Sequence, residues 1–185
     1  KSAGIFNPEK LRSVNGDHIK AKEANELAPL LLPFIRAKGY DIGEGEKLNK
    51  IIGNLQGRAK TLMEMADKAE FFFKEEIEYD GEAAKNFLRP EVIDIFDELI
   101  EGFKGMEIMS GAKIASLFKG VVERRGIKLV KVAQPVRVAL TGSTASPGLF
   151  EVIDILGKEQ TIKRLEEARA FIRVSVARPG GENEG

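Results

Sequence analysis

The stretch VAQPVRVALTGSTASPGLF, residues 132–150, is the part of this chain that decides its fold. It places one charged residue, Arg137, inside an apolar run, and a turn rich in Gly, Ser, Thr and Pro follows before the apolar pattern resumes. Burying an unpaired guanidinium costs several kcal/mol. We therefore expect Arg137 either to pair inside the protein, for example with a helix-end carbonyl, or to face an anionic or polar partner.

The valines of residues 130–140 favour a strand by propensity. No second clear strand pattern is present to pair with it, so we predict a helix here that ends near Gly142. Pro147 is expected to open the next helix, which continues to Leu156. A last amphipathic helix is predicted over residues 158–172.

Helical spacing of apolar residues continues through the rest of the chain. Near the start, Pro8 is expected to begin a helix with Asn7 as its cap. Residues 25–38 predict another helix, with Pro29 in its first turn and a kink at Pro33. The residues of that helix expected to face the core are Leu27, Leu30, Leu31 and Phe34.

The predicted fold is all-α, with two consecutive helical subdomains. Asp80 and Gly81 form a turn signal, and we place the subdomain boundary there. A Gly/Pro/Glu segment at the end of the chain offers no core face and is predicted to be disordered. The predicted parts are a junction at residues 1–24, a first subdomain at 25–81, a second at 82–173 and a tail at 174–185.

The net charge is zero, from 29 basic and 29 acidic side chains, which by itself argues against nucleic-acid binding. The charges are unevenly distributed, however. Residues 64–107 hold 14 acidic and 5 basic side chains, whereas residues 113–137 hold 7 basic side chains and the acidic Glu123. Such a separation can steer a polyanion to one end of a molecule, although two solvated helix faces would give the same pattern.

Composition limits the class of protein further. Hydrophobic residues make up 43% of the chain, enough for a core, yet no apolar run approaches the roughly 20 residues of a membrane-spanning helix. The absence of cysteine excludes disulfides and thiolate metal sites and fits a reducing cytosol. The chain begins with neither a methionine nor a signal-peptide segment, so we expect a piece of a longer cytoplasmic protein.

The sequence predicts no catalytic residue, no metal site and no cofactor in this chain. His18 is the sole histidine, and with Asp17 beside it a surface position is expected rather than a catalytic pair. The loop at residues 142–148 lacks the Lys-Ser/Thr pair of a phosphate-binding loop, so a turn between helices is expected. Binding is therefore the function that the residues favour.

Four segments together resemble one protein family. AQPVRVALTG (133–142) and SPGLFEVIDILGK (146–158) closely resemble the C-terminal anticodon-binding region of bacterial glutamyl-tRNA synthetases. QGRAKTL (56–62) resembles a second segment of that region, and FNPEKLRSVNGDHI (6–19) resembles the junction before it. The resemblance runs from Phe6 to Ile172 and implies the α-helix cage fold of class I synthetases.

The resemblance also implies particular contacts with tRNA. Arg137 and the loop residues Ser146, Pro147 and Leu149 match positions that contact anticodon bases. Loop hydroxyls can recognise base edges, and proline and leucine can offer an apolar face to splayed-out bases. Arg58 matches the arginine that recognises the third anticodon letter, with an ordinary exposed arginine as the alternative. Candidate contacts to the tRNA backbone are Lys60, Lys128 and Lys131.

The catalytic half of the family, with its ATP-binding motifs, lies outside the resemblance. We therefore expect this chain to bind tRNA without aminoacylating it. The resemblance implies that the full-length enzyme joins glutamate to tRNA(Glu) with ATP and magnesium, as a cytoplasmic monomer without membrane association. Charging of tRNA(Gln) by the same enzyme stays open, and a freestanding helical protein-interaction adaptor is the alternative function.

Overall fold

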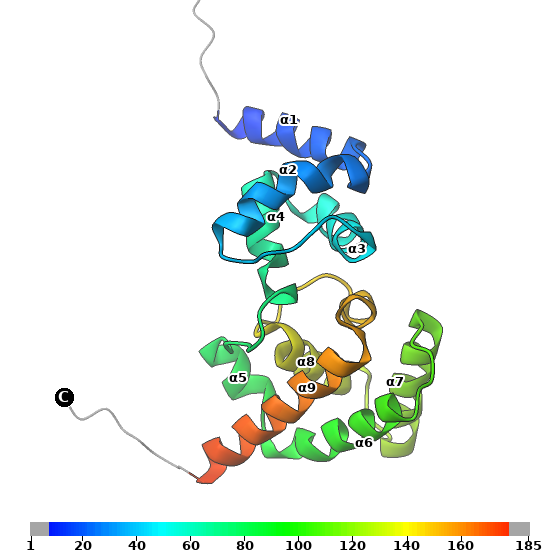
Figure 1. Ribbon diagram of the computed structural model, residues 1–185. Coiled ribbons are helices and arrows are strands. Elements are labelled where there is room, and N and C mark those ends of the chain that lie inside the picture. The colour runs from blue at the N-terminus through cyan, green and yellow to red at the C-terminus, as the bar shows by residue number, and fades with distance from the viewer. Residues whose placement is uncertain (1–7, 178–185) are drawn as a thin grey trace, which may run out of the picture. The chain divides into compact units, whose positions relative to one another are not determined.

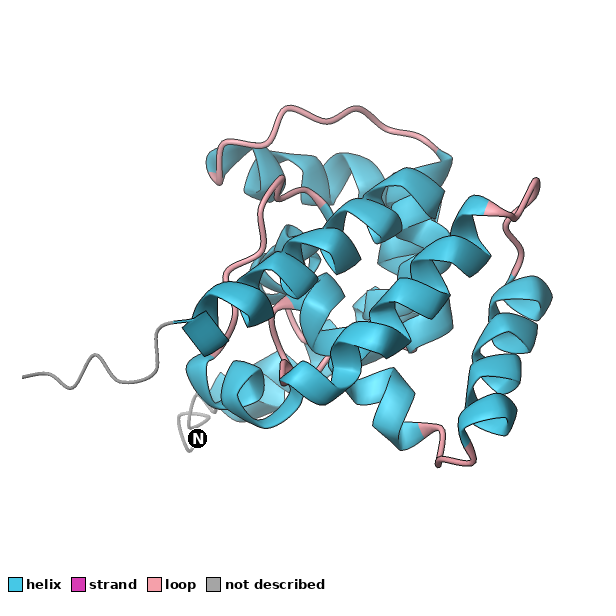
Figure 2. Ribbon diagram, turned by 90° about the horizontal axis from the view of Figure 1, so that it is seen from below, coloured by secondary structure: helices cyan, strands magenta, loops and turns pink. Residues whose placement is uncertain are grey.

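The computed structural model describes residues 8–177, with side chains from residue 15 onward. Every regular element in this part of the chain is a helix (Figures 1 and 2), which confirms the all-α prediction. Helix α1 begins at Pro8 as predicted, while its predicted cap, Asn7, lies outside the described residues. The elements are α1 (Pro8–Ala21), α2 (Ala24–Ala37), α3 (Glu46–Leu55), η1 (Gln56–Arg58), α4 (Leu62–Ala69), η2 (Glu70–Phe72), α5 (Gly81–Phe87), η3 (Pro90–Val92), α6 (Ile93–Lys104), α7 (Gly111–Arg125), α8 (Val130–Thr141) and α9 (Leu149–Ala177), where η marks a 3-10 helix.

The chain divides after Phe73 into two compact units, before the Asp80–Gly81 turn at which we placed the boundary. The intervening segment belongs to the second unit because its backbone is hydrogen-bonded there. The Lys74 carbonyl accepts a hydrogen bond from Arg164 at 2.8 Å. The Asp80 N–H donates at 2.8 Å to the carbonyl of the residue that caps α8. A turn in the sequence therefore did not mark the point at which packing changes.

In the first unit, helix α2 packs against both α3 and α4. Of the four α2 residues predicted to face the core, two are buried, but Leu30 and Phe34 are 47% and 40% exposed. Leu32 and Ile35 are buried in their place. The helix is apolar on most of its surface, so two different sets of its apolar residues recur with the helical period. Contact with α3 and α4 determines which set is buried.

The start of α2 also differs from the prediction. The helix begins at Ala24, so Pro29 lies beyond its first turn. Pro29 and Pro33 are therefore both inside the helix. Each proline removes one N–H from the helical hydrogen-bond pattern. The beginning of the helix is stabilised instead by the Glu23 N–H, which donates to the Glu26 carboxylate at 3.0 Å.

In the second unit, helix α9 packs against α6, α7 and α8 (Figure 1). Three phenylalanines fill the space between these helices: Phe96, Phe103 and Phe118 are fully buried. Phe118 meets Phe150 of α9 edge-on, with ring centroids 5.2 Å apart. Aromatic burial of this kind supplies a large part of the hydrophobic stabilisation of a small helical unit.

Helix α8 confirms the helix predicted where the valines favoured a strand. Val132 and Val136 are fully buried, so their apolar surface is covered by helix packing rather than by a sheet. The helix ends at Gly142, which adopts the left-handed conformation with a φ of 77°. This conformation is costly for any residue with a Cβ atom.

Helix α9 differs from the prediction at both ends. It begins at Leu149 rather than at Pro147, because its first helical hydrogen bond runs from the Val152 N–H to the Gly148 carbonyl (2.9 Å). It continues to Ala177, so the first four residues of the predicted tail are helical, and residues 178–185 lie outside the described part. The two predicted helices are separated by a kink at Gly157, where φ is 79° and ψ is 173°.

We expect Gly142→Ala to destabilise the second unit by about 3 kcal/mol or more. The alanine would adopt an unfavourable φ, and its Cβ would collide with the Glu78 carbonyl oxygen. Gly126→Ala is the matched control, because Gly126 has a φ of 62° but no atom of the described residues lies within 4 Å of the place its Cβ would take. It should lose only about 1–2 kcal/mol. Urea unfolding measures both, and equal losses would contradict the close approach of Glu78.

Candidate nucleic-acid interface

Arg137 lies half buried on α8, where its guanidinium holds the end of the following loop. Its Nη1 donates to the Pro147 carbonyl at 2.7 Å and also to the Ser146 hydroxyl. The Ser146 hydroxyl in turn lies 2.9 Å from the Pro147 carbonyl. The structure thus brings together three of the residues predicted here, and it gives Arg137 the internal carbonyl partner that we considered as one alternative.

The beginning of the same loop is held by Thr141, at the end of α8. The Thr141 hydroxyl donates to the Arg137 carbonyl at 2.8 Å. The same hydroxyl accepts a hydrogen bond from the Ser143 N–H at 3.4 Å. The Ala145 N–H then donates to the Ser143 hydroxyl at 3.2 Å. With both ends held, the loop exposes Thr144 and Ala145 to solvent.

Pro147 and Leu149 do not present the exposed apolar face that we expected. Both are buried, with Leu149 only 6% exposed, because Leu149 is the first residue of α9 and packs into the second unit. The exposed loop residues are instead Thr144 and Ala145, which we did not single out. A run of small and polar residues carries no periodic signal that separates its exposed members from its buried ones.

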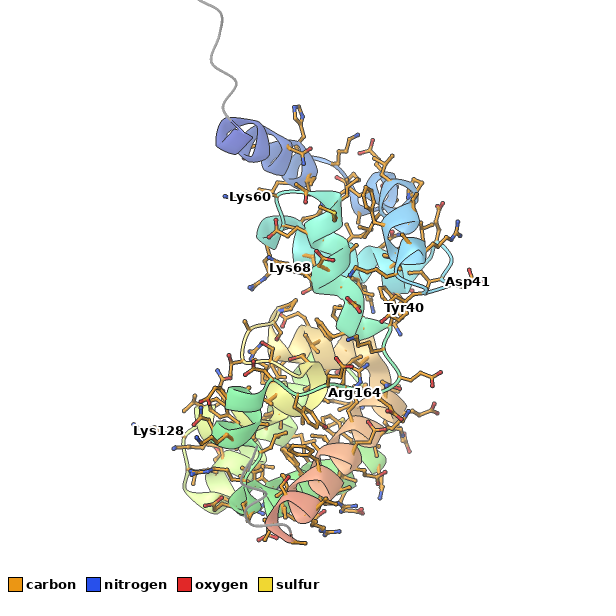
Figure 3. The ribbon with its side chains drawn as sticks, turned by 90° about the vertical axis from the view of Figure 1, so that its left-hand side faces the viewer. Tyr40, Asp41, Lys60, Lys68, Lys128 and Arg164 are labelled. Atoms are coloured by element: carbon orange, nitrogen blue, oxygen red, sulfur yellow. The ribbon has the colours of Figure 1, made fainter. Side chains whose placement is uncertain are left out.

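Arg58 occupies a different environment in the first unit. It ends η1, it is exposed, and no side chain or carbonyl of the described residues pairs with its guanidinium. The next residue, Ala59, is 2% exposed and anchors the backbone. Lys60 is exposed again and extends outward from the ribbon (Figure 3). The segment therefore alternates an exposed cation, a buried anchor and another exposed cation.

The backbone after Arg58 is held by the side chains of Thr61, which precedes α4, and Glu64 in its first turn. The Lys60 N–H donates to the Glu64 carboxylate at 2.9 Å, and the Thr61 hydroxyl accepts from the Glu64 N–H at 3.0 Å. Thr61 is thus the helix cap of α4. A hydrogen bond from Lys68, together with the one from the Lys60 N–H, holds the pKa of Glu64 below its usual value. The carboxylate is therefore charged, and it caps this backbone, at neutral pH.

Lys128 and Lys131, predicted as backbone contacts, are exposed at the start of α8. Between them, Leu129 and Val130 are 46% and 53% exposed, so cations and apolar side chains share this corner. The Lys128 side chain extends away from the ribbon in Figure 3. The two lysines are thus accessible to a polyanion.

Two other cations of the basic segment are engaged inside the protein. Arg124 and Arg125 both donate to the Glu98 carboxylate, at 2.6 and 2.8 Å, and Arg125 also donates to the Asp94 carbonyl at 2.8 Å. Partial burial would raise the pKa of Glu98, but the hydrogen bonds from the two arginines outweigh it and hold that pKa below its usual value. The positive charge that residues 113–137 offer to a ligand is therefore smaller than their number of basic side chains indicates.

Arg164 is a structural residue that sequence analysis missed. It is fully buried on α9 and donates to the Leu140 carbonyl at 2.7 Å and to the Lys74 carbonyl at 2.8 Å. Burial lowers its pKa to about 10, opposed by the negative charge of Glu167. Its spacing from the buried residues Leu165 and Ala168 places it on the apolar face of the helix, and this spacing was the available signal.

Three further features of the described residues bear on function. His18 is exposed, as predicted for a surface histidine. Among the side chains that the structure describes, residues 15–177, no group of three or more histidine or acidic residues is arranged to hold a metal ion. Within the same residues, no helix combines the length and the hydropathy required to span a membrane.

Comparison with known proteins identifies a family. The model of the family described as "Anticodon binding domain" matches residues 26–169. The glutamate–tRNA ligase of Geotalea uraniireducens is 44% identical over 173 residues, which are 94% of this chain and 37% of that protein. The glutamate–tRNA ligase of Syntrophobacter fumaroxidans is 45% identical over 172 residues, with 93% and 37% covered. The chain thus spans little more than a third of the curated relatives and aligns with their C-terminal part.

Solved structures share the fold. A glutamate tRNA ligase from Elizabethkingia meningosepticum, crystallised with its amino acid, superposes with a TM-score of 0.83 at 24% identity, over 90% of this chain and 33% of that one. The glutamate–tRNA synthetase of Elizabethkingia anophelis gives a TM-score of 0.77 at 23% identity, over 89% and 32%. At this identity the likeness concerns the fold.

We expect Arg164→Met to lower the free energy of unfolding of the second unit by about 2–4 kcal/mol. Methionine keeps most of the volume but leaves the buried Leu140 carbonyl and the partly buried Lys74 carbonyl without this donor. Arg173→Met is the control, because Arg173 is exposed on the same helix, and it should change stability by less than about 0.5 kcal/mol. Thermal or urea unfolding measures both; similar effects would contradict a bridging role for Arg164.

A pH titration tests the pairing of Glu98. Its folded-state pKa lies below the ordinary value of 4.5, so its contribution to stability is complete above pH 4.5 and is lost as the pH falls through the folded-state pKa. The stability difference between the natural chain and Glu98→Gln should therefore shrink on acidification. Glu107→Gln, at an exposed position, should give no such trend. A pH-independent difference for Glu98→Gln would contradict the pairing.

Proposed function

This chain belongs to the anticodon-binding domain family, and from that membership we propose that it recognises the anticodon of tRNA(Glu) within a glutamate–tRNA ligase. The observation that carries the proposal is the Arg58 guanidinium, which is exposed and without a partner among the described residues, on an anchored backbone. An exposed guanidinium with five donors is suited to the acceptor edge of an unpaired base. A protein-interaction adaptor is not favoured, because family membership points to RNA.

The chemistry of Arg58 favours one base at the third anticodon letter. Glutamate and glutamine anticodons differ there, with cytosine in the first and guanine in the second. Cytosine offers two acceptors, O2 and N3, to a group that can only donate. Guanine presents donors at N1 and N2, so donors would face donors, and the larger purine would crowd the site. The proposed selectivity is thus repulsion of guanine as much as attraction of cytosine.

The loop after α8 is the second proposed anticodon contact. Arg137 and Ser146 hold its end, and Thr144 and Ala145 are its exposed members. A loop that is already ordered loses little conformational entropy on binding, which favours affinity. Pro147 and Leu149 would support the loop from below rather than stack on bases, since both are buried.

The remaining proposals concern the tRNA backbone and the whole enzyme. Exposed Lys60, Lys128 and Lys131 would contact phosphates, which raises affinity without selecting a sequence. The whole enzyme would ligate glutamate to tRNA with ATP and magnesium, in the cytoplasm and as a monomer. The described residues would supply tRNA recognition to that reaction and no part of its chemistry.

Affinity measurements with two tRNAs test the proposal. We expect the chain to bind tRNA(Glu) more tightly than tRNA(Gln), and Arg58→Gln to narrow that ratio because glutamine can both donate and accept. Arg58→Ala should weaken tRNA(Glu) binding by about 1–3 kcal/mol.

The control is Arg173→Ala, which removes an exposed arginine elsewhere and should leave the ratio of the two affinities unchanged. An unaltered ratio in Arg58→Gln would show that Arg58 does not recognise the base. Binding of neither tRNA at low salt would contradict the proposed function itself, since phosphate contacts are strongest there.

A further inference from the structure

The backbone that carries Arg58 is attached to helix α1 by side-chain amides. The Gln56 amide nitrogen donates to the Lys22 carbonyl at 2.7 Å and to the Ile19 carbonyl at 3.1 Å. On the other side of Arg58, the Asn15 amide nitrogen donates to the Lys60 carbonyl at 2.7 Å. Hydrogen bonds to α1 and the residue after it therefore occur on both sides of the arginine.

Packing brings the same two segments into direct contact. Gly16 of α1 is buried, and a Cβ atom placed on it would lie 3.5 Å from the Lys60 Cα. Ile19, one turn further along α1, is 4% exposed, and Ala59 is 2% exposed. Helix α1 thus packs directly on the backbone that follows Arg58.

These amides also satisfy groups that the helices leave open. The last carbonyls of a helix have no intrahelical donor, and Gln56 donates to one carbonyl in the last turn of α1 and to the carbonyl of the residue after the helix. The Lys60 carbonyl lies between η1 and α4, where no regular element supplies a donor, and Asn15 supplies one. Removing either amide frees one side of the arginine-bearing backbone.

We propose that Asn15 and Gln56 are positioning residues for anticodon recognition: by binding α1 to both sides of the Arg58 segment, they set where the Arg58 guanidinium meets the third anticodon base. This inference rests on the proposed function. Among the described residues no partner orients the Arg58 guanidinium, so the protein fixes its position through the backbone to which the side chain is attached. A donor group with a fixed point of attachment discriminates between bases better than one on a mobile backbone, because the backbone cannot shift to accommodate the wrong base.

A double-mutant cycle with both tRNAs tests the inference. We expect Asn15→Ala or Gln56→Ala to reduce the preference for tRNA(Glu) over tRNA(Gln) by about three- to ten-fold, the range of one lost hydrogen bond. In the Arg58→Ala background the same changes should leave the preference unaltered, because the group that they position is gone. Gln56→Glu, which keeps the shape of the side chain but cannot donate, should behave like Gln56→Ala.

The matched control is Asn54→Ala. Asn54 lies on α3, close to Gln56 in sequence, and its amide donates to the Lys50 carbonyl at 2.9 Å within the same helix. Its removal deletes the same kind of bond without touching α1 and should leave the preference unchanged. Each variant is first checked by thermal unfolding, so that affinities are compared between folded proteins.

The outcomes separate this inference from the proposed function. If Arg58→Ala abolishes the preference but Asn15→Ala and Gln56→Ala keep it, the positioning role is refuted and the proposed function stands. Equal weakening for both tRNAs, also in the Arg58→Ala background, would indicate a general loss of structure and would likewise refute it. If the natural chain binds both tRNAs without preference, the positioning role is refuted and tRNA binding stands, whereas binding of neither tRNA refutes the proposed function.

Discussion

The second unit depends on the buried guanidinium of Arg164. A cation removed from water needs polar partners, because the cost of leaving it unpaired is several kcal/mol. Arg164 donates to the carbonyl of Leu140, in the last turn of α8, and to the carbonyl of Lys74, in the segment at residues 74–80 through which the chain enters the second unit. Three segments far apart in the chain must therefore be in place together. The segment at residues 74–80 has no helix of its own, and this bond is one reason why it belongs to the second unit.

The candidate loop follows from this arrangement. The Glu78 carbonyl of the same entering segment lies against Gly142, and the Asp80 N–H donates to the Gly142 carbonyl at 2.8 Å. The start of the loop is thereby fixed from outside, while Arg137 holds its end from within. The position of the loop therefore depends on the hydrogen bonds of Arg164 to Leu140 and Lys74 as much as on the residues of the loop itself.

The first unit solves the same problem with neutral amides. Carbonyls at helix ends and between short elements need donors, and Gln56 and Asn15 provide them around Arg58. Because these amides donate to the carbonyls, the side chains of Arg58 and Lys60 are not needed for that purpose and stay exposed to a ligand. In the second unit, by contrast, Arg124 and Arg125 are engaged with acidic helix α6, which reduces the charge that its basic segment can offer. The net charge of the chain therefore does not show which cations are paired within the protein and which, such as Arg58 and Lys60, are accessible.

Much of the local structure was evident from the sequence alone. Apolar spacing predicted the helices, Pro8 was recognised as the start of α1, and Gly142 was recognised as the end of α8, because these depend on backbone geometry within a few residues. The exposed arginine at position 58 was also found, although from a resemblance rather than from periodicity.

Other features were decided only by the tertiary structure. These are the stripe of α2 that is buried, the division after Phe73, the burial of Leu149, the partners of Arg137 and the bridge made by Arg164. Each depends on which distant segment comes within hydrogen-bonding or packing distance. A helical period indicates that one face of a helix is apolar, and a charge inside an apolar run indicates that the side chain needs a polar partner. Neither identifies the neighbouring segment, because that segment is brought into contact by the folding of the rest of the chain.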